Sequence, residues 1–228
     1  MLDVGAGQEA LLYWLARHCG RVVGVDIYGE GSFAYREAPA SMTSDPGAHA
    51  PYPYPEDRLE IRSMDARNLD LPDSSFDVVV SMSSIEHFGG PDGIRRAAQE
   101  IGRVLKPGGH ALLAVDVFLR VATIHRTPVA FAARLATLGR RASGATLRRR
   151  LVEGLTRSEL GSLIVGPSGL ELLQPLRVAG DPAGLANVHR LQTDGSTVPD
   201  SGTPFPHLVV GIDGSLLTSV CLPLVKPG

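Results

Sequence analysis

The start of the chain, residues 2–26, holds the side chains best suited to bind a ligand. Asp3 lies in a short apolar run, Gly5 and Gly7 follow it, and Asp26 closes the next apolar run. Glycines at such a turn permit positive φ and a close approach of the backbone to a ligand, where a Cβ would clash. The N–H groups of a helix after the turn would point back at it. The pattern predicts a polar ligand over the turn, with Asp26 placed to hold a ribose.

Two classes of ligand fit this pattern. The sequence Gly5-x-Gly7-x-x-Ala10 satisfies the dinucleotide fingerprint with alanine in the third place, and Asp26 lies about the right distance downstream for a ribose 2′-hydroxyl. An NAD(P)-dependent oxidoreductase is therefore one interpretation. Asp3 argues against it, because a carboxylate two residues before the first glycine repels a pyrophosphate and attracts an ammonium group.

Three segments, in this order and spacing, carry a resemblance to a known family. They are 3–7 (Asp-Val-Gly-Ala-Gly), 71–79 (Leu-Pro-Asp-Ser-Ser-Phe-Asp-Val-Val) and 104–113 (Val-Leu-Lys-Pro-Gly-Gly-His-Ala-Leu-Leu). They resemble motifs of the class I S-adenosylmethionine-dependent methyltransferases, in which the glycine loop lies under the amino-acid end of the cofactor. Glu9 departs from the family pattern, which commonly has a third glycine there. The resemblance implies S-adenosyl-L-methionine as the cofactor and a Rossmann-like methyltransferase fold.

The resemblance also implies which residues bind the cofactor. Asp26 would hold the ribose hydroxyls, and Asp65 would accept a hydrogen bond from the adenine amino group, with the backbone of Ala66 completing the base contact. The full set expected to bind the cofactor is Asp3, Gly5, Ala6, Gly7, Asp26, Ile27, Asp65, Ala66 and Ser81.

His87 is the candidate catalytic residue. It lies in residues 82–90, which follow a predicted strand, and ligands gather outside the carboxyl ends of parallel strands. An imidazole there is suited to take a proton from a hydroxyl acceptor. The alternative is that the Glu86-His87 pair supports the loop. The two cysteines lack metal-ligand spacing, and no metal site is predicted.

Hydrophobic patterning predicts the elements that would position these residues. Strands are predicted at residues 2–4, 22–27, 59–64, 76–81, 111–117 and 169–178, and helices at 8–19 and 91–105. The first helix is expected to bury Leu11, Leu12, Trp14, Leu15 and Cys19. Residues 28–58, rich in proline, predict a long loop with one short helix near 33–38. Its tyrosines would either cover the cofactor or pack on the sheet edge.

These elements predict an α/β fold with a doubly wound, mostly parallel seven-stranded sheet. A terminal hairpin, 207–212 and 215–225, would insert its last strand antiparallel beside the fifth strand. The predicted division is a cofactor-binding core at 1–117, an arginine-rich helical insertion or lid at 118–157, and a remainder at 158–228 that completes the same domain.

The arginine-rich segment stands out because the chain as a whole has a net charge of −2. Residues 118–157 contain nine arginines and one glutamate. They would bind an anionic acceptor or form a solvated basic face. The overall charge gives no basic field of the kind that nucleic-acid binding needs.

The ends of the chain lead to two further expectations. Without a signal peptide or an uncharged apolar run of about 18 residues, we expect a cytoplasmic protein with no transmembrane segment. Met1 lies inside the first predicted strand, whereas this family usually carries helices before it. We therefore expect a shortened or mis-started form, with an exposed apolar patch and reduced stability.

The predicted function is methyl transfer from S-adenosyl-L-methionine to an unidentified small-molecule acceptor by direct displacement. The acceptor would be anionic if the arginine-rich segment binds it. Two alternatives stay open. One is the NAD(P)-dependent oxidoreductase, and the other is a truncated methyltransferase-like fold that acts as a non-catalytic binding partner.

Overall fold

The computed structural model of the protein describes residues 1–31, 37–120, 153–176, 209–212 and 215–228. The chain divides into two compact units, each considered by itself. The first comprises Met1–Val115, Ser158–Leu176 and Cys221–Gly228, and the second Asp116–Arg157 and Arg177–Val220. Every ligand-binding residue predicted from the sequence lies in the first unit.

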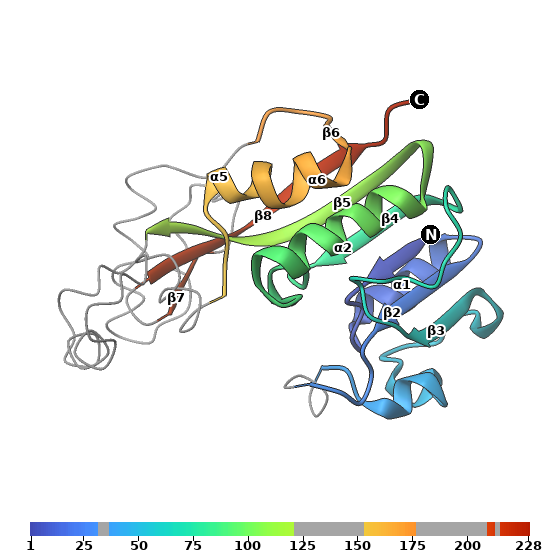
Figure 1. Ribbon diagram of the computed structural model, residues 1–228. Helices are drawn as coiled ribbons and strands as arrows, with labels where there is room; N and C mark the ends of the chain where they lie inside the picture. The colour runs from blue at the N-terminus through green and yellow to red at the C-terminus, as the bar shows by residue number, and fades with distance from the viewer. Residues whose placement is uncertain (32–36, 121–152, 177–208, 213–214) are drawn as a thin grey trace, which may run out of the picture. The chain divides into compact units, whose positions relative to one another are not determined.

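The first unit holds most of the described elements (Figure 1). The strands of the chain are β1 (Leu2–Val4), β2 (Val22–Asp26), β3 (Leu59–Ser63), β4 (Phe76–Met82), β5 (Leu105–Arg120), β6 (Glu171–Leu172), β7 (Val209–Ile212) and β8 (Ser215–Val225). The α-helices are α1 (Ala10–His18), α2 (Gly90–Val104), α5 (Arg157–Glu159) and α6 (Gly166–Ser168), with a π-helical turn η6 (Leu160–Val165) between the last two. Short 3₁₀ turns are η1 (Ala40–Thr43), η2 (Pro46–His49), η3 (Glu56–Arg58) and η4 (Ile85–His87).

Seven strands follow one another across the sheet in the order β3-β2-β1-β4-β5-β8-β6, and β7 pairs with β8. The pairs β1–β2, β1–β4, β2–β3 and β4–β5 are parallel, whereas β8 is antiparallel to β6 and to β7. β8 lies beside β5, as predicted. The doubly wound, mostly parallel sheet with antiparallel C-terminal strands is thus confirmed.

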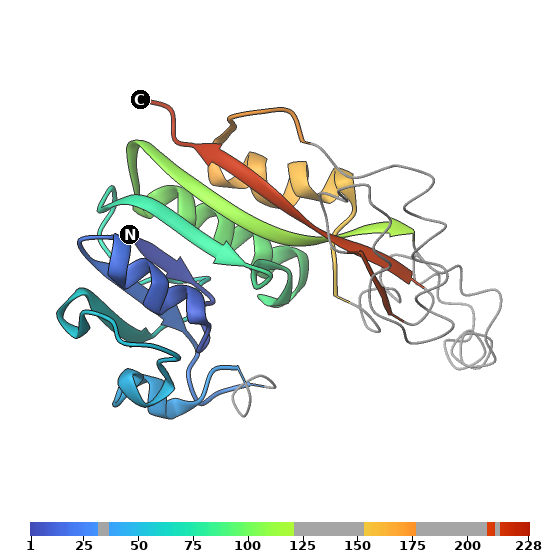
Figure 2. The ribbon, with the colours of Figure 1, turned by 180° about the vertical axis from the view of Figure 1, so that it is seen from behind.

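The chain reverses its direction across the sheet between β1 and β4. From β1 it crosses through α1 to β2, and from β4 it crosses through α2 to β5 on the other side. Because such crossovers are right-handed, opposite directions place α1 and α2 on opposite faces, as Figures 1 and 2 show. Ligands bind at this kind of switch point, beyond the carboxyl ends of the strands.

The buried face of α1 differs from the prediction at one large residue. Trp14 is 50% exposed and stacks on His18, whereas Tyr13 is fully buried. Tyr13 is favoured inside because its ring packs in the core while its hydroxyl donates a hydrogen bond to the Pro46 carbonyl at 2.8 Å. Leu12 and Leu15 are buried as predicted, whereas Leu11 and Cys19 are only partly buried.

The segment between β2 and β3 is the predicted loop, with three 3₁₀ turns. The short helix expected near 33–38 falls largely outside the described residues. The Tyr28 hydroxyl donates to the Gly7 carbonyl at 2.7 Å, and the Tyr52 hydroxyl donates to the Ala10 carbonyl at 2.8 Å. Tyr54 packs edge-on against Tyr13. The tyrosines therefore hold the loop in place by packing, but their partners here are the glycine turn and α1 rather than the predicted sheet edge.

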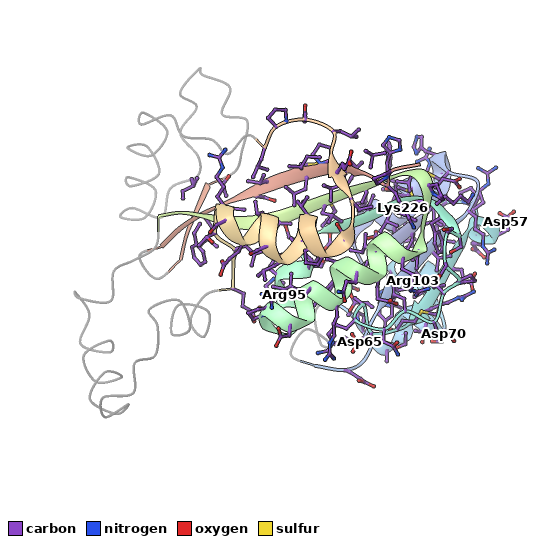
Figure 3. All side chains as sticks on the ribbon, turned by 45° about the horizontal axis from the view of Figure 1, so that its top comes forward. Asp57, Asp65, Asp70, Arg95, Arg103 and Lys226 are labelled. Atoms are coloured by element: carbon purple, nitrogen blue, oxygen red, sulfur yellow. The ribbon has the colours of Figure 1, made fainter. Side chains whose placement is uncertain are left out.

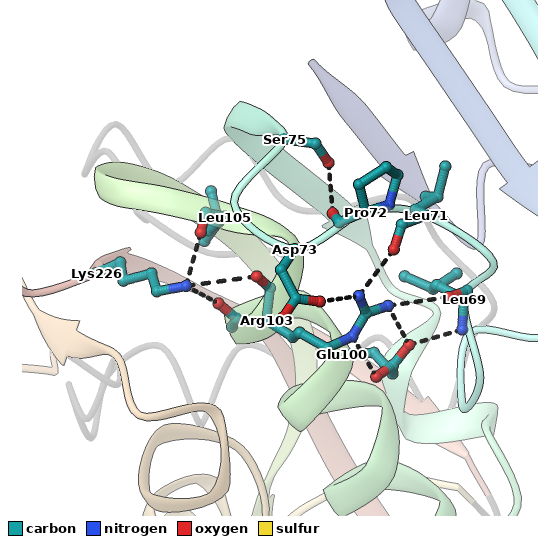
Figure 4. A network of polar contacts seen from close by, with 10 residues as sticks. Leu69, Leu71, Pro72, Asp73, Ser75, Glu100, Arg103, Leu105 and Lys226 are labelled. Atoms are coloured by element: carbon teal, nitrogen blue, oxygen red, sulfur yellow. Dashed lines mark hydrogen bonds and ion pairs between the residues drawn. The ribbon is translucent and has the colours of Figure 1, made fainter.

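A polar network holds the end of α2 to the link before β4 and to the C-terminal strand (Figures 3 and 4). The Arg103 guanidinium donates to the carbonyls of Leu69 and Leu71 and pairs with Glu100 and Asp73. The Lys226 ammonium donates to three carbonyls at the helix end, those of Gly102, Arg103 and Leu105. These contacts satisfy carbonyls that a helix terminus leaves without partners.

Two strand predictions need correction. β5 begins at Leu105, which was predicted to end a helix, and it includes residues 106–110, before the strand predicted at 111–117. The extra residues form an irregularity in the β4–β5 register. β6 is only Glu171–Leu172 within the predicted 169–178, whose last two positions lie outside the described residues. The arginine-rich segment also lies mainly outside them, so its predicted helices and lid role stay predictions.

Candidate functional site

The glycine turn after β1 adopts the conformation that its sequence predicts. Gly5 and Gly7 have φ of +73° and +51°. A Cβ on Gly5 would lie 2.4 Å from the Cβ of Ser84, and a Cβ on Gly7 would lie 2.8 Å from the Glu37 carbonyl oxygen. Both the backbone conformation and the space therefore require glycine at these two positions.

Asp26, at the end of β2, fixes this turn from the side. One carboxylate oxygen accepts the Gly7 N–H at 2.9 Å, and the other accepts the Ile27 N–H at 2.7 Å. Burial raises the pKa of Asp26, while these two N–H groups act in the opposite direction. Each oxygen keeps a further lone pair, so the carboxylate can still accept a hydrogen bond from a ligand hydroxyl.

Asp3 is the most deeply buried acid of the site, at 3% exposed. Burial, and then the nearby carboxylates of Asp26 and Glu9, raise its pKa to about 7. Within the described part of the chain, no hydrogen-bond donor contacts this carboxylate. A buried carboxylate without a donor is costly unless a positive partner reaches it, and a bound cation would supply that partner.

Asp65 lies after β3, and its carboxylate is engaged by Arg67. The Arg67 Nε atom lies 2.8 and 2.9 Å from the two carboxylate oxygens, and Nη2 lies 2.6 Å from one of them. The Arg67 side chain lowers the pKa of Asp65, although both side chains are substantially exposed. An adenine amino group would share this carboxylate with the guanidinium.

The loop after β4 closes the site against the glycine turn. The Ser84 hydroxyl donates to the Gly5 carbonyl at 2.9 Å. Ser83 has a positive φ of 47°, which is uncommon for a non-glycine residue and is found at turns and functional sites. His87 ends the short turn η4 and lines the cavity, whereas Ser81 is fully buried and does not line it.

These residues surround one cavity with a volume of about 680 Å³. Eight of the nine predicted cofactor residues line it, and Ser81 is the exception. The side chain of Ser81 points into the protein because successive residues of a strand alternate between faces, and Met82 takes the position toward the cavity. The described lining residues are Asp3, Gly5, Ala6, Gly7, Glu9, Leu11, Asp26, Ile27, Glu30, Glu37, Ala38, Met64, Asp65, Ala66, Arg67, Met82, Ser83, Ser84, His87, Phe88 and Gly89.

The described lining is strongly acidic. Six carboxylates face one arginine, and that arginine is already paired with Asp65. Such a cavity disfavours a pyrophosphate and favours a ligand with positive charge.

The lining residues that were not predicted from the sequence include Glu9 as an acid of the cavity, Arg67, Ser84 and Phe88. The position of Glu9, at a family glycine, was the one available signal. The Ser84 hydroxyl contacts Gly5, which is 79 positions away in the chain, so local patterning gives no signal for it. In the described ranges, no cluster of three or more His, Cys, Asp or Glu side chains is arranged to hold a metal ion. None of the described helices combines the length and apolarity needed to cross a membrane.

The strand order and the cavity at the switch point define a doubly wound α/β protein with a cavity beyond the carboxyl ends of its parallel strands. Residues 2–113 match the family model described as a methyltransferase domain. Through these residues the chain belongs to the class I S-adenosylmethionine-dependent methyltransferase family.

Individual relatives agree with this assignment. The chain is 33% identical over 120 residues to a phosphatidylethanolamine N-methyltransferase of Cereibacter sphaeroides, covering 53% of this chain and 51% of the relative. It is 27% identical over 113 residues to the uncharacterized methyltransferase YcgJ of Bacillus subtilis (strain 168), covering 50% of this chain and 39% of the relative. The chain thus spans about half or less of the length of these two curated relatives.

A solved structure shows the same fold. Geranyl diphosphate C-methyltransferase of Streptomyces coelicolor A3(2), crystallised with Mg²⁺, geranyl diphosphate and S-adenosyl-L-homocysteine, aligns with a TM-score of 0.57 at 16% identity. The alignment covers 99% of this chain and 70% of that one.

Proposed function

We propose that this chain binds S-adenosyl-L-methionine in the cavity over the glycine turn and transfers its methyl group to a small-molecule acceptor. The observation that carries the proposal is the acidic lining around Gly5 and Gly7, with Asp3 buried and without a donor among the described residues. A nicotinamide dinucleotide would bring its pyrophosphate into this field, and the family assignment also disfavours the oxidoreductase alternative.

The residues of this chain have distinct roles in the proposal. Asp26 accepts hydrogen bonds from the ribose hydroxyls while it holds the Gly7 N–H. Asp65 and Ala66 hold the adenine, and Ile27 contributes apolar contact to the nucleoside. Asp3 faces the ammonium group of the methionine part, which compensates its buried charge.

Catalysis in this proposal depends mainly on positioning. When bound, S-adenosyl-L-methionine offers a methyl group on a sulfonium; the acceptor's electron pair forms the new bond to carbon, and the carbon–sulfur pair stays on sulfur. The rigid glycine turn and the loop at Ser84 hold the donor site in place, and holding two reactants in line supplies much of the rate. His87, on the cavity wall, takes the proton that a hydroxyl or protonated amine acceptor releases.

The first acceptor to test is a lipid with an ethanolamine headgroup. A relative that is 33% identical carries the name phosphatidylethanolamine N-methyltransferase. Free ethanolamine and vesicles with and without phosphatidylethanolamine distinguish a soluble acceptor from a lipid one. The anionic acceptor suggested by the arginine-rich segment is a separate proposal, because that segment lies mainly outside the described residues.

Calorimetric titration with S-adenosylhomocysteine and with NADH tests the binding part. We expect saturable binding of S-adenosylhomocysteine and none of NADH; the reverse would favour the oxidoreductase. Release of S-adenosylhomocysteine from S-adenosyl-L-methionine, measured across an acceptor set, tests the transfer. Cofactor binding without transfer to any acceptor would favour the non-catalytic binding partner. His87→Gln should lower turnover and leave cofactor affinity unchanged if His87 takes the proton.

A further inference from the structure

The cavity contains more negative charge than holding one ammonium group requires. Asp3, Glu9 and Asp26 all line this cavity, and after burial itself the charges of Asp26 and Glu9 raise the pKa of Asp3. These three come from the end of β1, the start of α1 and the end of β2, so the fold itself brings them together. Arg67, the guanidinium in the described lining, is already paired with Asp65 and does not offset them.

Glu9 is the member of this cluster whose carboxylate makes no structural contact within the described residues. It stands at the N-cap position of α1 with extended backbone angles, and its side chain caps no helical N–H. Within the described residues, its carboxylate has no ion-pair or hydrogen-bond partner. Glu9 lines the cavity near the glycine turn, so its negative charge acts on whatever the cavity binds.

We propose that the cluster of Asp3, Glu9 and Asp26 makes the cavity select the methylated, cationic cofactor over its demethylated product. This inference rests on the proposed function. S-Adenosyl-L-methionine carries a positive sulfonium that S-adenosylhomocysteine lacks, and the two molecules are otherwise nearly the same. Contacts to adenine, ribose and the amino-acid end therefore cancel in a comparison of the two, and the difference in affinity reports the sulfonium charge. Glu9 acts as a specificity residue in this mechanism.

Selection by charge has a consequence for turnover. Transfer of the methyl group removes the sulfonium charge, and the attraction of the cluster for that atom ends in the same step. The product is then held by the shared contacts alone, so it is bound less tightly than the methylated cofactor that it competes with. Product inhibition is therefore weak in this chain.

The test is calorimetry with three probes: S-adenosyl-L-methionine, S-adenosylhomocysteine, and sinefungin, in which an amine-bearing carbon replaces the methylated sulfur. In low salt we expect the parent to bind the two cationic probes about tenfold more tightly than S-adenosylhomocysteine, a ratio that decreases at about 0.5 M salt because exposed charges are screened. Glu9→Gln should weaken binding of both cationic probes roughly threefold to tenfold and leave S-adenosylhomocysteine unchanged, since a carboxylate near a cation is lost.

Because Glu9 is exposed, we expect Glu9→Gln to fold like the parent. The matched control is Glu171→Gln, which changes an exposed acid on β6 that does not line the cavity. Equal or tighter binding of S-adenosylhomocysteine by the parent would overturn this inference and leave the proposed function standing. So would an equal effect of Glu9→Gln on all three probes. Binding of none of the three would overturn both.

Discussion

Asp26 and Gly7 are joined by a 2.9 Å hydrogen bond from the backbone N–H of the glycine turn to the carboxylate at the end of β2. The two residues are 19 positions apart in the chain, and they meet because β1 and β2 are parallel neighbours. The same carboxylate that would hold a ribose therefore also holds the turn that would lie under the methionine part of the ligand.

Replacing Asp26 should weaken ligand binding more than it weakens the fold. Asp26→Ala removes a charge-assisted hydrogen bond to the ligand, so S-adenosylhomocysteine affinity should fall by roughly ten- to a hundredfold. Asp45→Ala is the matched control: Asp45 also accepts a backbone N–H, from Ala48 at 3.1 Å, and does not line the cavity. Calorimetry of both variants checks the prediction, and unchanged affinity in Asp26→Ala would refute the role given to the end of β2.

The stability of the protein without ligand should fall as pH rises toward neutrality, because of Asp3. Its pKa is raised from 3.8 to about 7 by burial and by neighbouring acids. The folded state then binds more protons than the unfolded state between these values, so the free energy of unfolding decreases with pH across this window. Below it the stabilisation is complete, and above it the stabilisation is lost.

Asp3→Asn should flatten this dependence. The variant carries no titrating group at position 3, so denaturant unfolding between pH 5 and pH 8, run for both proteins, should give a smaller fall in the free energy of unfolding than in the parent. Asp70→Asn, an exposed acid that does not line the cavity, serves as the control. A parent whose stability rises with pH through this window would contradict the burial assigned to Asp3.

Asp65 and Arg67 should contribute unequally to ligand affinity. Asp65→Ala removes the acceptor proposed for the adenine amino group, and S-adenosylhomocysteine affinity should fall about tenfold. Arg67→Gln leaves that acceptor in place and removes an exposed ion pair of small net energy, so we expect less than about a threefold change. Both variants are compared by calorimetry, and a larger loss with Arg67→Gln would mean that the guanidinium, rather than the carboxylate, contacts the ligand.

Lys226 should matter for stability and not for ligand binding. Lys226→Met retains the aliphatic part of the side chain but removes the donor to the carbonyls of Gly102 and Leu105, while the Arg103 carbonyl keeps its hydrogen bond from the Ser74 N–H. The free energy of unfolding should fall by roughly 1–3 kcal/mol. Lys106→Met, which removes an exposed ion pair with Asp77, should cost less than about 1 kcal/mol. Denaturant unfolding measures both. A similar loss in the two variants would show that the network at the end of α2 contributes little.

The amino-acid sequence by itself determined the strands β1 to β4 and the glycine turn, because these depend on information that is local in the chain. Apolar runs mark strands, and two glycines two residues apart mark a turn that must adopt positive φ. The resemblance of residues 3–7, 71–79 and 104–113 to one family then predicted the sheet that the structure contains.

Tertiary structure decided which side chains face the cavity and what surrounds each charge. The side chain of Ser81 is buried and that of Met82 is exposed, because neighbouring residues of a strand lie on opposite faces of the sheet. The apolar sequence of β4 does not indicate which of its two faces is toward the cavity. The raised pKa of Asp3 exists because the fold buries this carboxyl group and because separate elements bring Asp26 and Glu9 near it. Burial and electrostatic interactions of this kind depend on distances between residues far apart in the chain, and only the folded chain sets those distances.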